Sequence, residues 1–461
     1  MPLDNIPVEA PFVPWSPEPP ERPMPFLKGI TTFLRNPLET IPALAYREPI
    51  VHARGVRDVF WVCDPSLVKD VLLDRRELFP KDLLGRRVLG PIVGDGILTA
   101  EGQSWRWQRQ TVAPLFRHAD LLGYVPAMVA GADVAVAAWR ATPPGTRHQV
   151  DADMTRATYH VISNTVLAGG GDKVGEALGV KAERYGHGLQ WSLAYAAVGV
   201  PEWAPRPLRR MMRRREALVR GAVLEIVRQR RQEAAGPDDL LARLMAATEP
   251  DTGRRMTDDE LTDNLLTFLV AGHDTTAKAL AWTLYLLARA PAWQQRVFAE
   301  VAAVVGDGPV AGDHIDRLAV TRQVLKESLR LFPSVPVMTR MAAEDVELGG
   351  RQVPKGTIVG IPIYAIHRHQ ALWDRPEAFD PARFAPEREK AHDRYQFMPF
   401  GGGPRVCVGG AFAMIEATAI LASVVRAARF DWPRGPDPVP LSRIVLTPKH
   451  GIPLKVTLRE A

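Results

Sequence analysis

Residues 400–410 read FGGGPRVCVGG and place one cysteine, Cys407, inside a glycine-rich loop. An Ala-rich apolar stretch that predicts a helix follows directly, at residues 411–428. Glycine at this density indicates backbone that turns sharply or approaches another group closely. A free cysteine at a turn is often an inert core residue. A helix N-terminus, the adjacent Arg405 and above all a metal ion would instead hold Cys407 as a thiolate.

A single thiolate suffices as the protein ligand when the other equatorial positions of a metal belong to a macrocycle. Haem ligated by a thiolate fits this description, because the sulfur pushes electron density toward O–O cleavage. Cys63 is the other cysteine of the chain. Two cysteines exclude a disulfide framework and a Cys-rich zinc or iron–sulfur site. We interpret Cys63 as an inert core residue.

The longest expected helix lies between Thr257 and Pro291. Thr257 and Glu260 have the spacing of a capping box, and Pro291 ends the run. Such a helix, of roughly 33 residues, would be about 50 Å long and would have to cross the molecule. AGHDTT, residues 271–276, lies in its middle and brings polar side chains into an apolar stretch. Buried polar groups are costly unless they are hydrogen-bonded or used, so both a satisfied kink and a functional groove remain open.

The cysteine loop resembles the haem-binding signature of cytochromes P450, Phe-x-x-Gly-x-Arg-x-Cys-x-Gly, matched by Phe400, Gly403, Arg405, Cys407 and Gly409. Three further stretches match family patterns in the family's order: WRWQR with Trp105 and Arg109, AGHDTT at 271–276, and KESLR with Glu327 and Arg330. These matches lie between residues 100 and 410. The chain thus resembles a soluble, bacterial-type cytochrome P450 monooxygenase over most of its length.

The resemblance implies a haem b (iron protoporphyrin IX) cofactor and O2 as co-substrate. Cys407 would be the proximal iron ligand, with Phe400 packed beside its sulfur and Gly409 in the same loop. Asp274 and Thr275 would deliver protons during oxygen activation. The haem propionates are anions that need buried cationic donors. Their implied partners are Trp105, Arg109, Arg340 and Arg405.

A Glu and an Arg three residues apart on a helix usually form a surface ion pair of small value. The resemblance implies that Glu327 and Arg330 instead lock with Arg383, in PEAFDPARF at 376–384, and brace the cysteine loop. His273 is not expected to be a second axial ligand, because a neighbour of Asp274 on a helix points about 100° away from it. His367 and His369 are interpreted as structural.

The resemblance also suggests the walls of the substrate cavity, which are largely apolar. We therefore expect a hydrophobic, small or medium-sized organic substrate that is hydroxylated or epoxidised. AGHDTT and FPSVP, at 332–336, look closer to the fatty-acid-hydroxylase-like branch. The implied wall residues lie in loops 82–100 and 185–200, and include Phe268, Ala271, Val335, Val337, Met338, Ile444 and Val445.

Helical periodicity dominates the chain, so the expected fold is mainly α with a small β part and a long central helix above the haem. Strand patterns occur at 58–64, in a hairpin at 345–364 turned by Gly349-Gly350, and in another hairpin at 444–458. Asp64-Pro65 predicts a helix start. We expect a single domain over residues 1–461, with a Pro-rich extended lead-in at 1–26.

The net charge of +6 comes largely from arginine clusters such as residues 206–215. Such a run is either a solvated helix face or a surface for an acidic partner. No nucleic-acid-binding pattern accompanies it. The best candidate membrane span, Leu261–Leu287, contains four ionisable residues, and no signal peptide precedes the chain, so we expect a cytoplasmic protein without an integral membrane segment.

Oxygen activation needs electrons, and the chain has no room for a flavin domain and too few cysteines for a usual iron–sulfur cluster. A separate ferredoxin or flavodoxin-type donor with its reductase is therefore expected. By resemblance it would dock on the cysteine side of the haem, where candidate residues are Arg106, Arg117, Lys390, Arg394 and Arg426. A non-catalytic haem-thiolate sensor and a peroxide-driven enzyme remain alternatives, although the Asp274-Thr275 pair favours use of O2.

Overall fold

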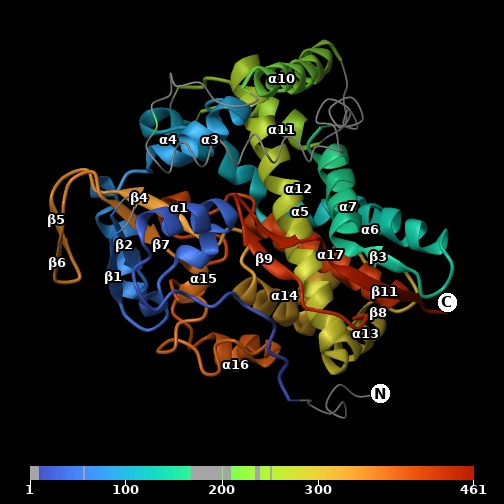
Figure 1. The fold of residues 1–461 in the computed structure, drawn as a ribbon. Helices are drawn as coiled ribbons and strands as arrows, with labels where there is room; N and C mark the ends of the chain where they lie inside the picture. The colour runs from blue at the N-terminus through green and yellow to red at the C-terminus, as the bar shows by residue number, and fades with distance from the viewer. Residues whose placement is uncertain are drawn as a thin grey trace.

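The structure is a computed structural model that describes residues 10–54, 58–167, 200, 209–233, 239–249 and 252–460. Within these ranges the chain is mainly helical, and short strands form small sheets at its periphery (Figure 1). The predicted fold class, mainly α with a small β part, is therefore confirmed.

The helices and strands have the following bounds. The α-helices are α1 Phe26–Arg35, α2 Pro65–Lys69, α3 Leu83–Val93, α4 Gly102–Val112, α5 His118–Leu121, α6 Val125–Arg140, α7 Val150–Thr165, α10 Arg209–Gln232, α11 Leu240–Ala246, α12 Asp258–Arg289, α13 Pro291–Val305, α14 Ala319–Leu331, α15 Ile363–Ile366, α16 Pro386–Glu389 and α17 Gly410–Ala427. The strands are β1 Ile50–Ala53, β2 Val59–Val62, β3 Arg147–Gln149, β4 Met338–Met341, β5 Val346–Leu348, β6 Arg351–Val353, β7 Ile358–Ile361, β8 Ala428–Asp431, β9 Val439–Ser442, β10 Leu446–Lys449 and β11 Pro453–Leu458.

Helix α12 forms the axis of the fold, as its length predicted. Its capping box is present: the Glu260 amide donates to Thr257 Oγ1 at 3.3 Å, and the Thr257 amide donates to Glu260 Oε2 at 3.0 Å. The helix runs 32 residues and ends just before Pro291, which opens α13. In Figure 1 it passes through the centre of the molecule, from α10 and α11 at one end to α13 at the other. The prediction of a helix that crosses the molecule is confirmed.

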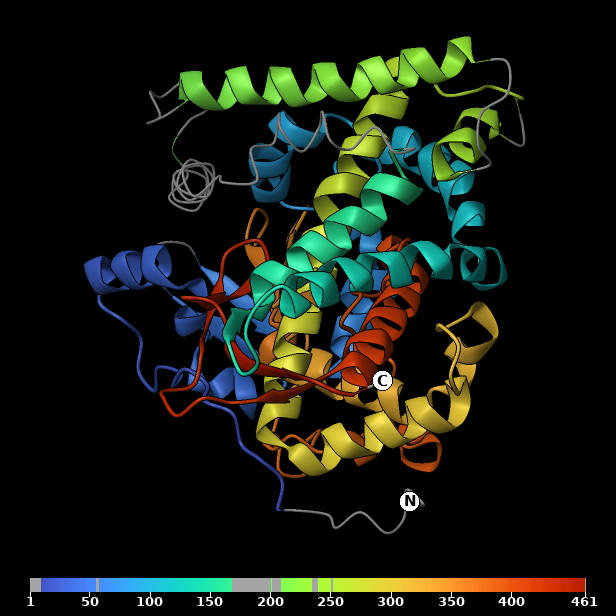
Figure 2. The ribbon, with the colours of Figure 1, turned by 90° about the vertical axis from the view of Figure 1, so that its right-hand side faces the viewer.

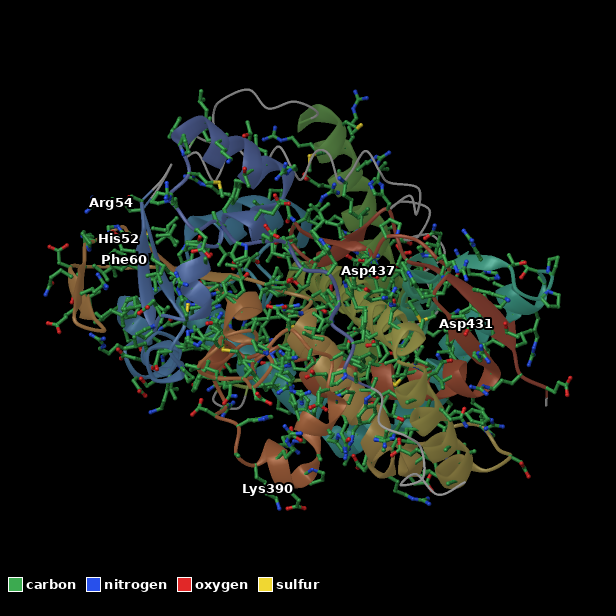
Figure 3. The ribbon with its side chains drawn as sticks, turned by 60° about the horizontal axis from the view of Figure 1, so that its bottom comes forward. His52, Arg54, Phe60, Lys390, Asp431 and Asp437 are labelled. Carbon is green, nitrogen blue, oxygen red and sulfur yellow. The ribbon has the colours of Figure 1, made fainter. Side chains whose placement is uncertain are left out.

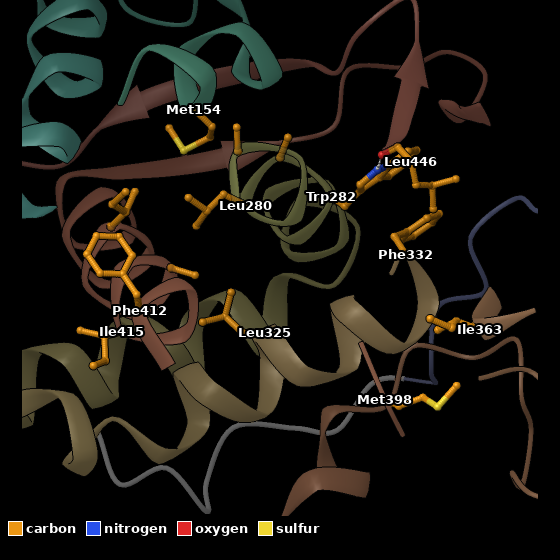
Figure 4. Close-up of a cluster of buried hydrophobic side chains, with 14 of the residues drawn as sticks. Met154, Leu280, Trp282, Leu325, Phe332, Ile363, Met398, Phe412, Ile415 and Leu446 are labelled. Carbon is orange, nitrogen blue, oxygen red and sulfur yellow. Dashed lines mark hydrogen bonds between the residues drawn. The ribbon is translucent and has the colours of Figure 1, made fainter. Parts of the chain in front are cut away.

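The apolar core surrounds the second half of α12. Trp282 stacks on Phe332 with ring centroids 4.0 Å apart, and Leu280 faces the side of α17 that carries Phe412 (Figure 4). Full burial of one such side chain stabilises the fold by roughly 1.5–3 kcal/mol. Helix α7 packs along the first half of α12, where Gly272 allows a close approach: a Cβ there would lie 2.8 Å from Ile162 Cδ1. Both faces of α12 are thus fixed by neighbouring helices.

The main sheet has the strand order β1-β2-β7-β4. Strand β7 pairs parallel with β2 and antiparallel with β4. The predicted hairpin is present as β5 and β6, joined at Gly349 and Gly350, whose φ values of 55° and 72° suit glycine. Asp64 caps α2 and Pro65 is its first residue, as predicted. The N-terminal and later parts of the chain both contribute strands to this sheet.

The second predicted hairpin, at 444–458, is wrong in its pairing. Both strands exist, but β10 pairs with β9, and β11 pairs with β3 and β8. Positive φ values at His450 and Gly451 redirect the chain between them. The Ile452 amide then donates to Asp151 Oδ1 at 3.0 Å, which draws β11 onto the start of α7. The local pattern suggested that these two strands pair with each other in a hairpin. Each of them pairs instead with other strands of the chain.

Helix α10 carries the described part of the arginine run and lies across one end of α12 (Figure 2). Some of its arginines are structural: Arg220 pairs with Asp259 and Asp263, and Arg231 with Asp258. Arg213 and Arg214 are exposed, which fits a solvated helix face. Residues 206–208 lie outside the described residues.

Two helical stretches in the described part of the chain are long and apolar enough to cross a membrane by length and composition, His118–Arg140 and Gly410–Ala427. The sequence prediction considered a different stretch, Leu261–Leu287, and missed both. The second of the two is α17, which packs against α6, α12, α13 and α14. Its apolar composition is that of a core helix.

Glu416 is a fully buried carboxyl group at the contact between α17 and α12. It is 1% exposed, Thr276 is its side-chain hydrogen-bond partner, and its Oε1 has no partner. Burial raises the pKa of Glu416 to about 8, against the hydrogen bond from Thr276, which lowers it. The folded protein therefore keeps this proton over a pH range in which an unfolded glutamate has lost it.

We expect Glu416 to make stability fall as pH rises from about 4.5 to about 8. In this window the unfolded state binds fewer protons, so each pH unit disfavours the folded state by up to about 1.4 kcal/mol. Glu416→Gln removes the titration. Between pH 5 and pH 8 the midpoint of thermal unfolding should therefore rise in the variant relative to that of the wild type. A constant offset between the two curves would contradict a retained proton at Glu416.

Candidate active site

The cysteine loop is held by its own backbone. The Cys407 amide donates to the Phe400 carbonyl at 2.9 Å, and the Phe400 ring lies beside Gly410. Gly403 has a φ of 67°, and a Cβ there would lie 2.1 Å from the carbonyl oxygen of Leu72. Only glycine fits at this position. The density of glycine in the sequence thus reflects close packing around the thiol.

The two cysteines lie in opposite environments. Cys63 is buried in the core, and burial raises the pKa of its thiol. Burial also raises the pKa of Cys407, and the Gly409 amide and the charge of Arg109 oppose this rise. The Cys407 side chain nevertheless has accessible surface. A thiol that lies deep in the protein and is still accessible faces an internal space, which is what a large bound cofactor requires.

Arg109, Trp105 and Arg405 lie around the cysteine loop. Arg109 donates to the Val406 carbonyl at 2.9 Å, next to Cys407. The Arg405 guanidinium lies 4.2 Å from the centre of the Trp105 ring and donates to Glu101 at 2.8 Å. Burial lowers the pKa of Arg109 and of Arg405. These two cationic side chains are therefore partly buried rather than fully exposed to solvent.

Lys81 joins this group and was missed by the sequence reasoning. It forms an isolated β-bridge with Arg340 and donates to the Leu98 carbonyl at 2.6 Å. Burial, together with the like charges of Arg405 and Arg340, lowers the pKa of Lys81 to about 8. No local pattern marks Lys81, because its neighbours come from distant segments.

Burial and the charge of Arg405 likewise lower the pKa of Arg340. The carboxylates that oppose the charges of Lys81, Arg340 and Arg405 are Glu101 and Asp82. Positive charge is thus in excess at this place. Buried cations need anionic partners, and two propionates would supply them. The residues present fit haem on two independent grounds, the accessible deep thiol and this excess of cations.

A buried ion pair lies behind the cysteine loop. Glu327 and Arg330 are both fully buried and form two hydrogen bonds of 2.7 and 2.8 Å. Arg330 also donates to the carbonyls of His367, Pro376 and Ala378 at 2.6 to 2.9 Å. Arg383, in the 3₁₀ helix Pro381–Phe384, lies 3.5 Å from Glu327. The structure thus brings Glu327, Arg330 and Arg383 together.

His367 connects this ion pair to the cysteine loop. Its Nε2 accepts from the Met398 amide at 3.0 Å, and its Nδ1 donates to the Arg330 carbonyl at 3.2 Å. Burial and the charge of Arg330 lower the pKa of His367 to about 3, so the ring is neutral. Met398 in turn accepts from the Gly401 amide at 2.9 Å. Hydrogen bonds therefore run from Arg330 into the segment that precedes Cys407.

The middle of α12 is an accessible stretch between buried ones. Residues 261–269 and 276–287 are buried, whereas Ala271 is exposed and residues 272–275 are half-buried. The helix is unbroken here, and Thr275 Oγ1 donates to the Ala271 carbonyl at 2.7 Å. Thr158 of α7 donates to the His273 carbonyl at 2.9 Å, and Ser334 to the Thr275 carbonyl at 2.9 Å. The accessible stretch supports the reading of AGHDTT as a groove.

Asp274 and His273 both lie toward α7. The Asp274 carboxylate is 3.5 Å from Lys278 Nζ. The His273 ring contacts Tyr159 edge to face at 5.8 Å, and its Nδ1 is 2.6 Å from the Leu269 carbonyl. His273 is thus engaged with α7 and its own helix, in line with its exclusion as an axial ligand.

The apolar wall residues gather near Thr275 and the cysteine loop. The Leu446 amide donates to the Ser334 carbonyl at 2.9 Å, which brings the segments after α14 and before β10 together beside α12. Met338 sulfur lies 3.3 Å from the place of a Cβ on Gly401. Phe268 is buried and contacts Phe116 at 5.6 Å. Loop 185–200 lies outside the described residues except for residue 200. The half-buried wall residues are Val335, Val337, Met338, Ile444 and Val445.

Comparisons with known proteins agree with this geometry. The family model Cytochrome P450 matches residues 45–456. Cyclooctat-9-en-7-ol 5-monooxygenase of Streptomyces melanosporofaciens is 31% identical over 88% of this chain and 90% of that protein. Cyclooctatin synthase of the same organism is 35% identical over 85% of this chain and 84% of that protein. The crystal structure of the cytochrome P450DA heme domain is similar with a TM-score of 0.82 at 28% identity, over 97% of this chain and 98% of that chain.

Proposed function

The chain belongs to the cytochrome P450 family and is a haem-dependent monooxygenase, and we propose that it hydroxylates or epoxidises a cyclic hydrocarbon or alcohol of low polarity. The accessible thiol of Cys407 deep in the protein is the observation that carries the site assignment. Two things support the substrate class: the wall residues are apolar, and one similar protein is named for oxidation of cyclooctat-9-en-7-ol.

Cys407 is the proposed iron ligand, and thiolate-ligated haem supplies the chemistry of oxygen activation. Phe400 and Gly409 hold the loop around the sulfur. The propionates would be bound by Trp105, Arg109, Arg340 and Arg405, as the resemblance implied, and by Lys81. Their excess positive charge supports this role. The Glu327–Arg330 pair and His367 keep the loop in place.

Thr275 and Asp274 are the proposed proton carriers. The Thr275 hydroxyl lies on the accessible stretch of α12 and donates to the Ala271 carbonyl, so its oxygen retains lone pairs that can accept a hydrogen bond from a proton donor. Asp274, the next residue, supplies a carboxylate that can hold a proton and pass it on. Protons delivered here would serve the oxygen activation that a bound haem supplies. This pair supports a monooxygenase over a sensor or a peroxide-driven enzyme.

Incubation with 18O2, cyclooctat-9-en-7-ol and a surrogate ferredoxin system should yield a product that has gained one 18O atom, detected by mass spectrometry. A linear fatty acid serves as the comparison substrate and should give less product. Thr275→Ala should still bind the cyclic alcohol but release more of the reducing equivalents as peroxide. No O2-dependent product would favour the sensor, and turnover with peroxide alone would favour the peroxide-driven enzyme.

The electron donor is proposed to be a separate acidic ferredoxin or flavodoxin. Arg106, within α4, and Arg117, directly after the 3₁₀ helix Ala113–Phe116, are exposed, as are Lys390 and Arg394. Lys390 projects from the surface after α16 (Figure 3). Arg426 is engaged otherwise, because it donates to the Gly308 and Asp307 carbonyls. The docking surface is therefore assigned to Arg106, Arg117, Lys390 and Arg394.

Complementary charge mainly speeds the encounter of two proteins, and at about 0.15 M salt the screening length is about 8 Å. Reduction by an acidic ferredoxin should therefore slow as ionic strength rises, in stopped-flow measurements. Arg106→Glu or Arg117→Glu should lower the association rate and leave substrate affinity unchanged. Arg214→Glu, on the exposed face of α10, is the control. If Arg214→Glu lowered the association rate more than Arg106→Glu or Arg117→Glu did, residues 206–215 would be the docking surface instead.

A further inference from the structure

Lys278 is a buried cation that the proposed chemistry does not use. The residue is 8% exposed and lies on α12, one turn after Asp274. Its Nζ is 3.5 Å from Asp274 Oδ1 and 3.4 Å from Thr155 Oγ1 of α7. The Thr155 hydroxyl donates its own proton to the Asp151 carbonyl at 2.7 Å, so it accepts from Lys278 through a lone pair. Lys278 therefore joins Asp274 to α7.

Asp274 is the carboxylate that balances Lys278 among the described residues. The acids of α7 are engaged elsewhere: Asp153 pairs with Arg156, and Asp151 accepts from the Ile452 amide. Glu416 of α17 has Thr276 as its partner. If Asp274 took up a proton, Lys278 would become a buried charge without a counter-ion. Leaving a buried charge unpaired is strongly unfavourable.

The geometry of the helix separates two positions for the Asp274 side chain. Residues four apart on a helix lie on one face, so the ion pair draws the carboxylate along α12 toward Lys278 and Thr155. Thr275 points about 100° away around the helix axis. Asp274 cannot keep its contact with Lys278 and approach the Thr275 hydroxyl with the same oxygen. Delivery of a proton to Thr275 by the oxygen that contacts Lys278 therefore requires that the ion pair opens.

We propose that Lys278 is a positioning residue that holds the Asp274 carboxylate against α7 and so sets the rate of proton delivery to Thr275. This rests on the proposed function of Asp274 as a proton carrier. In each delivery the ion pair opens and Asp274 takes a proton from a hydronium ion of the solvent, which leaves as water. Asp274 then passes this proton to the Thr275 oxygen while the Thr275 hydroxyl releases its own proton into the groove. The carboxylate then returns to Lys278, which keeps its own proton throughout. Lys278 thereby limits the step without touching the reacting atoms.

The ion pair itself is tested by a double-mutant cycle in chemical unfolding. Asp274→Asn, Lys278→Met and the double variant should show non-additive changes in unfolding free energy, since residues in contact couple. Additive changes would show that the pair is absent in solution, and the proposal would fall. This readout needs no turnover, so it separates the contact from its function.

The role in proton delivery is tested by single-turnover kinetics in H2O and D2O. Lys278→Met should speed the proton-dependent step by about three- to tenfold, the effect of removing a charge pair of modest strength, and reduce its solvent isotope effect. Lys278→Arg, which keeps the charge, should restore wild-type behaviour. Lys326→Met removes another lysine–carboxylate pair, between Lys326 of α14 and Glu389 of α16, and should leave the isotope effect unchanged.

The outcomes distinguish the proposal from its premise. If Lys278→Met leaves the rate and the isotope effect unchanged while Asp274→Asn slows the step, Lys278 is only structural and the proposal is wrong. If Asp274→Asn leaves the step unchanged, the proposed function of Asp274 has failed. The double variant Asp274→Asn, Lys278→Met should behave like Asp274→Asn alone, because Lys278 acts through Asp274.

Discussion

The buried ion pair between Glu327 and Arg330 is the interaction on which the site depends. Arg330 binds three carbonyls from the loop before the cysteine segment, and His367 carries the connection to Met398. Two fully buried charges stabilise a fold only when their hydrogen bonds are all made. Here the three carbonyls complete those of Arg330, the Asp380 amide donates to Glu327 Oε1 at 2.8 Å, and Arg383 adds a second cation 3.5 Å from Glu327. The position of Cys407 is therefore fixed by a network that lies well outside the thiol's own contacts.

Buried charges behave differently in the functional site and in the ion pair behind the cysteine loop. Around the cysteine loop, Lys81, Arg340 and Arg405 repel one another, which is a cost that anionic propionates would offset. On α12, Lys278 is balanced by Asp274, the residue assigned to proton transfer. Like charges thus repel one another around the cysteine loop, where an anionic ligand would relieve the repulsion, whereas the buried charge on α12 depends on the ionised form of Asp274. The buried charges of Glu327 and Arg330, by contrast, are paired with each other.

Local patterns predicted the parts of the fold that depend on nearby residues. The capping box of α12 and the Gly349-Gly350 hairpin each follow from contacts within a few residues, and each is present. Glycine density also marked the loop around Cys407, although the close approach at Gly403 is to the distant Leu72. Lys81 was missed because its partners come from other segments. Lys278 was missed because its contacts become important only through burial against α7. The C-terminal pairing was wrong for the same reason, since β11 joins β3 and β8 across the chain.

The central claim is that Cys407, deep and yet accessible, is the thiolate ligand of haem. The most direct measurement is the absorption spectrum of the reduced carbon monoxide complex in wild type, Cys407→Ser and Cys63→Ser. The wild type and Cys63→Ser should both show the thiolate-type spectrum, because Cys63 is closed inside the core. Cys407→Ser should lose it. A thiolate-type spectrum that survives in Cys407→Ser, or is lost in Cys63→Ser, would contradict the assignment.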